Sequence, residues 1–297
     1  MRTAERRVHA GRLNRSAICL AAGVLLATMD AEGARRISAW TAHSSSPGGH
    51  GVTSVGDFNG DGLQDFVIGG YPNLTGAVGA TIFFGAPQGS DFGSLVFAGP
   101  PFSSYATSVG GGGDLDSDGF DDLLIGSTNN LYVYRGGAPP DTTADVNIIL
   151  ANNGAFKTLA CGDWNADGYD DIAAGIQLDN RVYIYFGGAV LNAGIDRTII
   201  GDGNFGYSLA GNQDLSGDGI DDLVVGPPAG VFGIGRVYVY FGGSGFDTTP
   251  DKTFESPVPL GRLGDAVTLI ADWNADGQSD LAVGEPGFPG GGRTWVY

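Results

Sequence analysis

Residues 114–126 read DLDSDGFDDLLIG, an aspartate-rich loop that runs directly into a short apolar segment. The loop follows the pattern Asp-x-(Asp/Asn/Ser)-x-Asp-Gly-x-x-Asp, and the chain contains this pattern five times. The copies begin at residues 57, 114, 163, 214 and 272, so successive copies lie 49 to 58 residues apart. A pattern that recurs at this spacing indicates an array of one structural unit.

The residue types in this loop suit a calcium ion. Ca²⁺ takes about 6–8 oxygen ligands, and side chains at positions 1, 3 and 5 can converge on one point if the backbone then turns at the glycine in position 6. The aspartate in position 9 can complete the shell. The sequence therefore predicts five calcium sites, with the ligands Asp57, Asn59, Asp61, Asp65, Asp114, Asp116, Asp118, Asp122, Asp163, Asn165, Asp167, Asp171, Asp214, Ser216, Asp218, Asp222, Asp272, Asn274, Asp276 and Asp280.

Two simpler explanations of the loop fail. An EF-hand loop begins in the same way but needs an acidic ligand at position 12. Position 12 is apolar in every copy, being Ile68, Ile125, Ala174, Val225 or Val283. An ordinary Asp/Asn/Gly turn would explain one copy, but not five copies in register.

The segments between the loops predict β-strands. Residues 181–188 (RVYIYFGG) and 236–243 (RVYVYFGG) alternate β-branched and aromatic residues and end in glycine. The apolar segment after each loop, a third segment such as 196–200 and the stretch before each loop bring the count to four short strands per unit. No segment has a sustained helical period. We therefore expect an all-β fold, a β-propeller of about five four-stranded blades.

The loop followed by Val-Tyr-Val-Tyr-Phe-Gly-Gly resembles the FG-GAP repeat of integrin alpha-subunit propellers and of secreted bacterial FG-GAP/VCBS-type proteins. The resemblance covers about residues 37–297. It implies that each loop lies between the first and second strands of a blade and holds calcium, on the face opposite the main ligand surface.

The sequence departs from the integrin pattern in blade number, because integrin propellers have seven blades and five are counted here. The fifth unit stops at Tyr297, before a fourth strand. Residues 36–41 (RISAWT) resemble such a strand, so we expect them to complete the last blade and close the ring. The alternative is that the five units are a fragment of a longer array.

Residues 1–34 do not belong to the array. Five arginines precede an apolar stretch from Ala17 to Met29, which is too short to span a bilayer. This segment resembles a secretory signal peptide cleaved between Ala27 and Ala34, with a single uncleaved anchor as the alternative. We therefore expect a propeller domain over residues 35–297, no membrane span after signal removal, and a secreted, cell-surface or periplasmic protein.

The chain is strongly acidic, with 15 Lys+Arg against 33 Asp+Glu and a formal net charge of −18. Removing residues 1–34 changes the charge to −20, so nucleic acid is not an expected partner. Much of this acidity lies in the five loops. Cys161 is the one cysteine outside the leader, and we expect it to be a small buried residue.

Signals for an enzyme are weak. Residues 201–206 match a dinucleotide-binding pattern, but a strand-like segment follows where that motif needs a helix. Ser208 lies in a sequence resembling a nucleophile elbow, yet Ser108 occupies the same place in another unit. The histidines His43 and His50 lie in a Ser/Gly/Pro-rich loop. No catalytic residue is therefore predicted, and an enzyme is left uncertain but not favoured.

The favoured function is an extracellular binding or adhesion module for a glycan, a cell surface or a protein. The alternatives are an enzyme, or an accessory domain of one, acting on polysaccharide or phospholipid, and a structural surface scaffold. Loops between the second and third strands differ in length and side chains, which is typical of binding surfaces, and Tyr71, Phe232 and Phe288 are candidate anchors. A second set of aromatic residues lies near the loops that join one blade to the next. We expect half or more of this set to belong to the core between blades and the rest to line a sugar-binding rim; the residues are Phe102, Tyr105, Phe156, Phe205 and Tyr207.

Overall fold

The computed structural model describes residues 51–72, 78–87, 93–99, 105–150, 155–176, 179–201, 203–227 and 234–297. These residues form β-strands and no α-helix, and the strands make five antiparallel sheets, called blades 1 to 5 in chain order. The all-β prediction is confirmed.

Each blade is a simple meander in which consecutive strands are neighbours. Blade 1 contains β1 (Val52–Gly56), β2 (Asp65–Pro72), β3 (Val78–Phe83) and β4 (Ser94–Ala98). Blade 2 contains β5 (Ser108–Gly113), β6 (Asp122–Gly126), β7 (Asn130–Tyr134) and β8 (Val146–Ile149). Blade 3 contains β9 (Thr158–Gly162), β10 (Asp171–Ile176), β11 (Arg181–Tyr185) and β12 (Arg197–Ile200). Blade 4 contains β13 (Ser208–Ala210), β14 (Leu223–Gly226), β15 (Arg236–Tyr240) and β16 (Lys252–Glu255), and blade 5 contains β17 (Ala266–Ile270), β18 (Asp280–Glu285) and β19 (Arg293–Val296).

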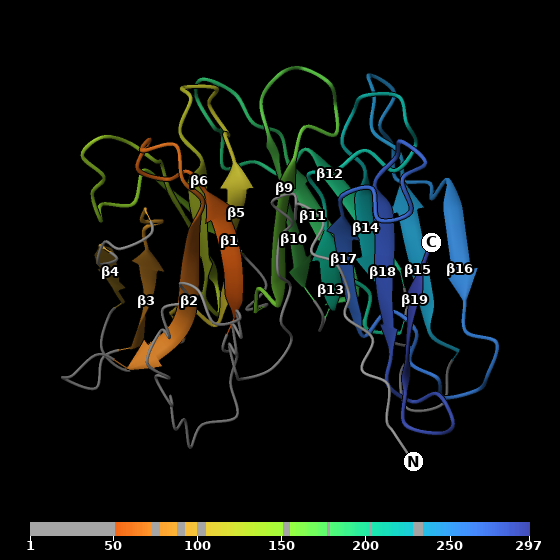
Figure 1. Ribbon diagram of the computed structural model, residues 1–297. Coiled ribbons are helices and arrows are strands. Elements are labelled where there is room, and N and C mark those ends of the chain that lie inside the picture. Colours follow the sequence, from red (N-terminus) through yellow and green to blue (C-terminus); the bar gives the residue numbers. More distant parts are fainter. Residues whose placement is uncertain are drawn as a thin grey trace, which may run out of the picture.

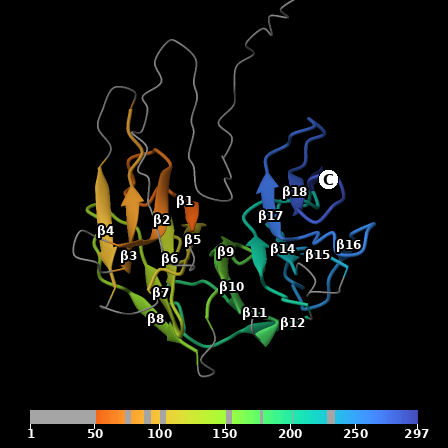
Figure 2. The same ribbon diagram turned by 90° about the horizontal axis from the view of Figure 1, so that it is seen from below.

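The blades stand side by side around an arc, as seen along its axis in Figure 2. The first strands of successive blades, β1, β5, β9, β13 and β17, lie next to one another on the inside of the arc. The later strands of each blade extend outward. This radial arrangement of four-stranded meanders is that of a β-propeller, as predicted.

Burial along the strands follows from their place in the blade. The second strands of blades 2, 3 and 4 lie between two neighbouring blades, and every residue of β6 and of β10 is buried. The outer strands β8 and β12 have only one buried residue each, because they lie at the rim. Continuous apolar second strands are the sequence counterpart of this arrangement.

The hydrophobic core lies between blades rather than within one blade. Four clusters of buried side chains are present, and each spans two consecutive blades. In the cluster between blades 3 and 4, the fully buried Trp164 stacks on Phe246 with 6.3 Å between the ring centroids. Each blade therefore depends on its neighbours for a core.

The predicted ring closure is not detected. Blade 5 has three strands in the described chain, and the expected fourth strand at residues 36–41 lies outside the described residues. No hydrogen bond or hydrophobic cluster among the described residues joins blade 1 to blade 5. The structure is thus an arc with two ends (Figure 2), and none of its described segments is a helix able to cross a membrane.

Candidate metal centres

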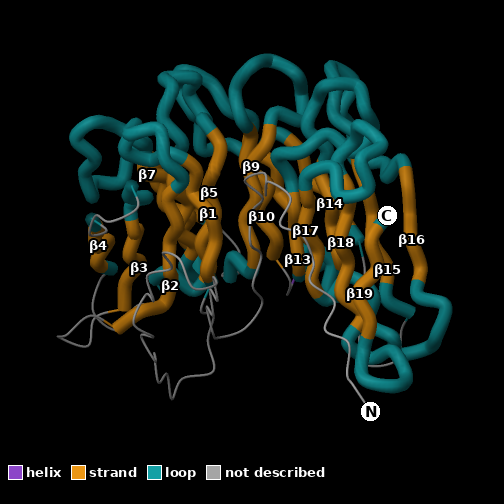
Figure 3. Tube along the Cα trace, in the orientation of Figure 1, coloured by secondary structure: helices purple, strands orange, loops and turns teal. Residues whose placement is uncertain are grey.

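The five aspartate-rich loops join the first strand of each blade to the second, which is where the resemblance places them. We call them loops 1 to 5 and number their residues 1 to 9, beginning at Asp57, Asp114, Asp163, Asp214 and Asp272. All five lie on one side of the molecule, the upper side in Figures 1 and 3. The second strands end on the opposite side.

The aspartate in position 1 organises the turn through its own backbone. In loop 3, the Asp163 carboxylate accepts hydrogen bonds from the N–H groups of Asp167 at 3.1 Å and Gly168 at 2.9 Å. Asp167 in turn accepts one from the N–H of Tyr169 at 3.0 Å. The same bonds recur in the other four loops. Hydrogen bonds between the carboxylates and the backbone N–H groups of the same loop therefore hold each loop in its turn without an ion.

The glycine in position 6 is required by backbone conformation. Gly168 has a φ of +89°, in the left-handed region that L-residues with a Cβ rarely adopt. A Cβ added there would meet no atom within 4 Å. Glycine is therefore needed at this position because of its backbone conformation, and not because a larger side chain would clash.

The aspartate in position 9 is buried in every loop, with 0–3% of its surface exposed. In loop 3, the Asp171 carboxylate accepts hydrogen bonds from the N–H groups of Trp164 at 3.1 Å and Gly187 at 2.9 Å. Gly187 follows the third strand, so this aspartate ties the loop to the centre of its blade. Asp280 in blade 5 keeps the bond from position 2, the N–H of Trp273. Its other oxygen accepts the side chain of Asn274 at 3.0 Å, in place of a glycine N–H after the third strand.

Burial disfavours the ionised form of the position 9 carboxyls in loops 1 to 4. Loss of solvent raises the pKa of Asp122 and of Asp171 to about 8 and that of Asp222 to about 6, and carboxylates in the same loop add to the rise. The pKa of Asp65 is also raised, mainly by burial. A buried carboxylate without a cation is costly, and a divalent ion would remove that cost.

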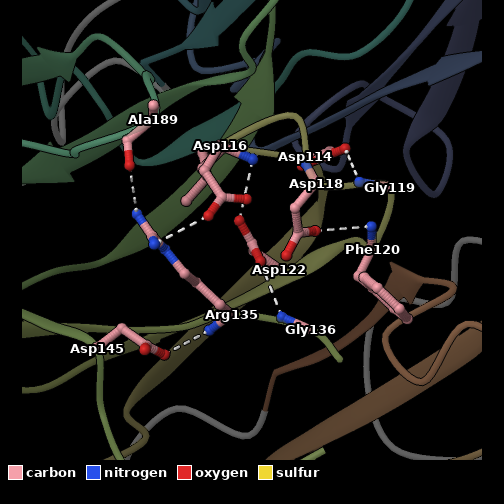
Figure 4. A network of polar contacts seen from close by, with 11 residues as sticks. Asp114, Asp116, Asp118, Gly119, Phe120, Asp122, Arg135, Gly136, Asp145 and Ala189 are labelled. Atoms are coloured by element: carbon pink, nitrogen blue, oxygen red, sulfur yellow. Dashed lines mark hydrogen bonds and ion pairs between the residues drawn. The ribbon is translucent and has the colours of Figure 1, made fainter. Parts of the chain in front are cut away.

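In loop 2, carboxylate oxygens of Asp114, Asp116 and Asp122 lie within 4.8 Å of one another (Figure 4). Asp116 Oδ1 is buried and has no hydrogen-bond partner. An unpartnered carboxylate oxygen pointing into a cluster of hard oxygen donors fits Ca²⁺. The donors in this loop therefore match the predicted ion.

Sequence reasoning missed Arg135, which forms an ion pair with Asp116 at 2.9 Å (Figure 4). Blade 2 has arginine where blades 3 and 4 have Phe186 and Phe241, and it also has aspartate in loop position 3 where the other loops have Asn or Ser. The extra acid and the extra base come together in the same blade. Comparing the five units position by position would have shown both departures.

Sequence reasoning also missed a contact between successive loops, through the residue in position 8. The Asp121 carboxylate of loop 2 accepts the N–H of Asp57 in loop 1 at 2.6 Å. Asp170 accepts the N–H of Asp114 at 2.7 Å, and Asp221 that of Asp163 at 3.3 Å. We call this contact the position 8 clamp. The doubled aspartates at 121–122, 170–171 and 221–222 were its visible signal.

The weak catalytic signals gain no support. β13 follows residues 201–206, where a dinucleotide-binding motif needs a helix. Ser208 Oγ donates to the carbonyl oxygens of Gly226 or Gly264 in its own and the next blade, at 3.2 and 2.7 Å. His43 and His50 lie outside the described residues.

The candidate aromatic residues divide in two. Tyr105, Phe156 and Phe205 are 1–3% exposed and belong to the clusters between blades, so they are core. Tyr207 is partly exposed, with Lys157 Nζ 4.6 Å from its ring centroid. Phe102 lies outside the described residues.

Of the three candidate anchors, only Phe288 can be placed. It is partly exposed, and the Arg293 guanidinium lies 3.5 Å from its ring centroid. Trp295 packs edge-on against the same ring. Phe232 and the side chain of Tyr71 lie outside the described part of the chain.

Part of the chain matches a known repeat family. Residues 114–174, from loop 2 to β10, match the FG-GAP-like repeat family. These residues contain two complete loops and the strands that follow them. The other three units share the same loop, the same hydrogen bonds and the same place in a blade.

Among curated proteins, the chain is similar to integrin alpha subunits. It is 31% identical to integrin alpha-5 of Xenopus laevis over 143 residues, covering 43% of this chain and 13% of the relative. It is 32% identical to integrin alpha-V of Gallus gallus over 219 residues, covering 63% of this chain and 20% of the relative. It is also 33% identical to phosphatidylinositol-glycan-specific phospholipase D of Rattus norvegicus over 161 residues, covering 46% of this chain and 19% of the relative.

The matched part is a fifth or less of each of these relatives. Among solved structures, the chain resembles BBS1N, crystallised in complex with ARL6DN and soaked with lead. The TM-score is 0.52 at 14% identity, with 84% of this chain and 66% of that chain covered. At this identity the likeness concerns the fold alone, and it agrees with the propeller architecture.

Proposed function

We propose that this chain is a secreted, calcium-binding propeller that acts as an extracellular binding module. The observation that carries the proposal is the set of five buried position 9 aspartates, four of which lie near other carboxylates of the same loop. Among the ion pairs between described residues, only that of Arg135 with Asp116 reaches a loop. The remaining buried carboxylates need a cation from solution.

Each loop would hold one ion through the residues in positions 1, 3, 5 and 9. A bound Ca²⁺ would supply the positive charge that lets the buried carboxyl ionise at neutral pH. The carboxylates and the position 6 turn would orient the ligand oxygens around it. Similarity to integrin alpha subunits supports an extracellular location and an extracellular protein partner for this chain.

The calcium proposal is tested by counting ions and by locating them. Calcium binding to the full chain, freed of metal by dialysis, is measured by titration calorimetry, with about five ions expected per chain. Tb³⁺ then replaces Ca²⁺ as a luminescent probe, because Trp164 and Trp273 occupy position 2 of loops 3 and 5. Tryptophan-sensitised Tb³⁺ emission that calcium displaces is expected, and its absence together with no calcium uptake would contradict the proposal.

For the ligand, we propose the side opposite the metal loops. The loops between second and third strands vary there on a rigid scaffold, which is where binding residues concentrate. A glycan array probed with and without calcium is the first assay. Binding should weaken when Tyr71, Phe232 and Phe288 are all changed to Ala. Full binding by that variant, together with loss of binding by folded loop variants, would place the surface elsewhere.

A second candidate function is an accessory domain of an enzyme that acts on phospholipid. The similarity to phosphatidylinositol-glycan-specific phospholipase D favours it over other enzyme classes. Sedimentation with phosphatidylinositol-containing vesicles, with phosphatidylcholine vesicles as the control, distinguishes it from the first proposal. Selective binding to the former would favour this candidate.

We further propose that residues 1–34 are removed during export, leaving the domain 35–297. Expression of the full chain in a secreting host, followed by intact-mass measurement of the exported protein, tests this. A retained leader would indicate the uncleaved anchor instead.

A further inference from the structure

The position 8 clamp holds both backbone groups of position 1 in the preceding loop. At the joint between loops 1 and 2, the Asp121 carboxylate accepts the N–H of Asp57, and the N–H of Asp121 donates to the carbonyl oxygen of Asp57 at 3.3 Å. At the joint between loops 2 and 3, the N–H of Asp170 likewise donates to the carbonyl oxygen of Asp114 at 3.2 Å. Position 1 supplies a proposed calcium ligand, and its carboxylate also holds the turn of the loop. The clamp therefore fixes the residue on which the preceding metal site depends.

A glycine before position 1 makes room for the clamp. A Cβ on Gly56 would overlap the Asp121 carboxylate, and one on Gly113 would lie 3.0 Å from Asp170 Oδ2. A side chain at this place would therefore push the carboxylate away from the N–H that it accepts. The three joints with a clamp share this pair of residues, which are Gly56 with Asp121, Gly113 with Asp170, and Gly162 with Asp221.

The joint between loops 4 and 5 departs from this pair at both places. Loop 5 has Ser279 in position 8, and Gln213 stands before position 1 of loop 4. Ser279 keeps the backbone half of the contact, since its N–H donates to the carbonyl oxygen of Asp214 at 3.3 Å. Its hydroxyl, however, donates to Gln213 Oε1 at 2.9 Å. This joint therefore has the same backbone contact with two neutral side chains in place of the glycine and the carboxylate.

The clamp places a negative charge beside the preceding metal loop. Burial raises the pKa of Asp121, and repulsion from the Asp114 and Asp57 carboxylates raises it further. A calcium ion in loop 1 would instead attract the Asp121 carboxylate. A charged acceptor also binds the Asp57 N–H more strongly than a neutral acceptor would. Residues just outside the ligands of a metal site commonly set its affinity in this way.

We propose that the position 8 aspartate of a loop raises the calcium affinity of the loop before it. Asp121, Asp170 and Asp221 act in this way on loops 1, 2 and 3, whereas the neutral Ser279 gives loop 4 no such charge. The inference rests on the calcium sites proposed above, and it goes beyond them by assigning control of each site to a residue of the next blade. The aspartate in position 8 is a positioning residue, because it acts through position 1.

The five loops can be followed separately in one protein. In every loop, the N–H of the position 6 glycine donates to the position 1 carboxylate, so its amide signal should move when that carboxylate binds an ion. These five reporters are Gly62, Gly119, Gly168, Gly219 and Gly277. The full chain, labelled with ¹⁵N and freed of metal, is titrated in calcium buffers and followed by two-dimensional NMR. Each glycine signal then gives the calcium midpoint of its own loop.

The first variant, Asp121→Asn, removes the charge but keeps an oxygen that can accept the Asp57 N–H. It should raise the calcium midpoint of loop 1 by about tenfold and that of loop 2 by less than about threefold. Asp247→Asn is the same change at an exposed turn, and it should move no midpoint. An unchanged loop 1 would show a clamp that is structural only, and equal changes in loops 1 and 2 would show a general effect of charge. Either result overturns the proposal.

The second variant moves the clamp to the joint that lacks it. Gln213→Gly/Ser279→Asp should lower the calcium midpoint of loop 4 by about tenfold, whereas Gln213→Gly alone should not, because it adds no charge. The comparison is made within loop 4, since Ser216 in position 3 also distinguishes that loop from the others. It remains decisive if Asp121→Asn does not fold, and an unchanged loop 4 midpoint contradicts the proposal.

The same titration separates this inference from the calcium proposal on which it rests. If no glycine signal responded to calcium, the metal sites themselves would be refuted. If the signals of all five loops responded but neither variant changed a midpoint, the sites would stand and the role of the clamp would be refuted.

Discussion

Removing calcium should make the stability of this protein fall more steeply as pH rises. Asp122 and Asp171 have folded pKa values of about 8, above the ordinary 3.8, because they are buried. Without an ion, the folded state binds more protons than the unfolded state between these values, so its stability falls as pH rises from about 4 to about 8. From pH 5.5 to pH 8, the loss is on the order of 3 kcal/mol for each of the two residues.

Calcium should offset this loss because it binds the ionised carboxylates. At about 1 mM calcium and a Kd of about 10⁻⁴–10⁻³ M, each site adds roughly 0.4–1.4 kcal/mol, or about 2–7 kcal/mol for five sites. This gain is largest at pH 8 and declines in acid, where protons compete with the ion. The assay is urea unfolding followed by tryptophan fluorescence at pH 5.5 and pH 8, with and without calcium.

The decisive comparison is the size of the pH effect. The metal-free protein should be more stable at pH 5.5 than at pH 8, and calcium should reduce that difference by about 2–7 kcal/mol. Asp171→Asn should shrink both the pH effect and the calcium gain, whereas Asp247→Asn, at an exposed turn outside the loops, should change neither. Equal pH dependence in calcium and in chelator would refute the reasoning.

Three further outcomes are expected. Asp163→Ala should lower the number of bound calcium ions by one while the far-UV circular dichroism of a β-protein is retained; an unchanged ion count would remove Asp163 from the ligands. Gly168→Ala should destabilise the fold by about 1–2 kcal/mol because its φ is +89°, whereas Gly245→Ala, equally uncrowded but without a positive φ, should be near neutral in urea unfolding. Cys161 is 3% exposed and burial raises its thiol pKa, so a thiol reagent should label it only in denaturant, and rapid labelling of the native protein would argue against this burial.

What could be predicted from the sequence was the structure that each unit builds from its own residues. The contact of Asp163 with the N–H of Gly168 spans five residues, so the loop pattern alone indicated the turn. Alternation in residues 181–185 likewise indicated the strand β11. These local patterns occur in every unit, and five occurrences at regular spacing distinguished them from a chance match.

What could not be predicted depended on the neighbouring blade. Asp121 acts on Asp57, 64 residues away, and nothing in the loop pattern gives position 8 a role. Trp164 and Trp273 occupy the same position of the repeat, yet one is buried and the other exposed, because among the described blades only the first is followed by another. The identity of the bound ligand depends on loops that share no pattern, and the sequence did not reveal it.

The position 8 clamp also bears on how such an array can grow. In each doubled aspartate, such as Asp170 and Asp171, the second residue serves its own loop and the first serves the loop before it. A duplicated stretch of about fifty residues would therefore carry its own attachment to whatever unit precedes it. Duplication of a unit with the doubled aspartate could therefore lengthen the array without a compensating change in the unit before it.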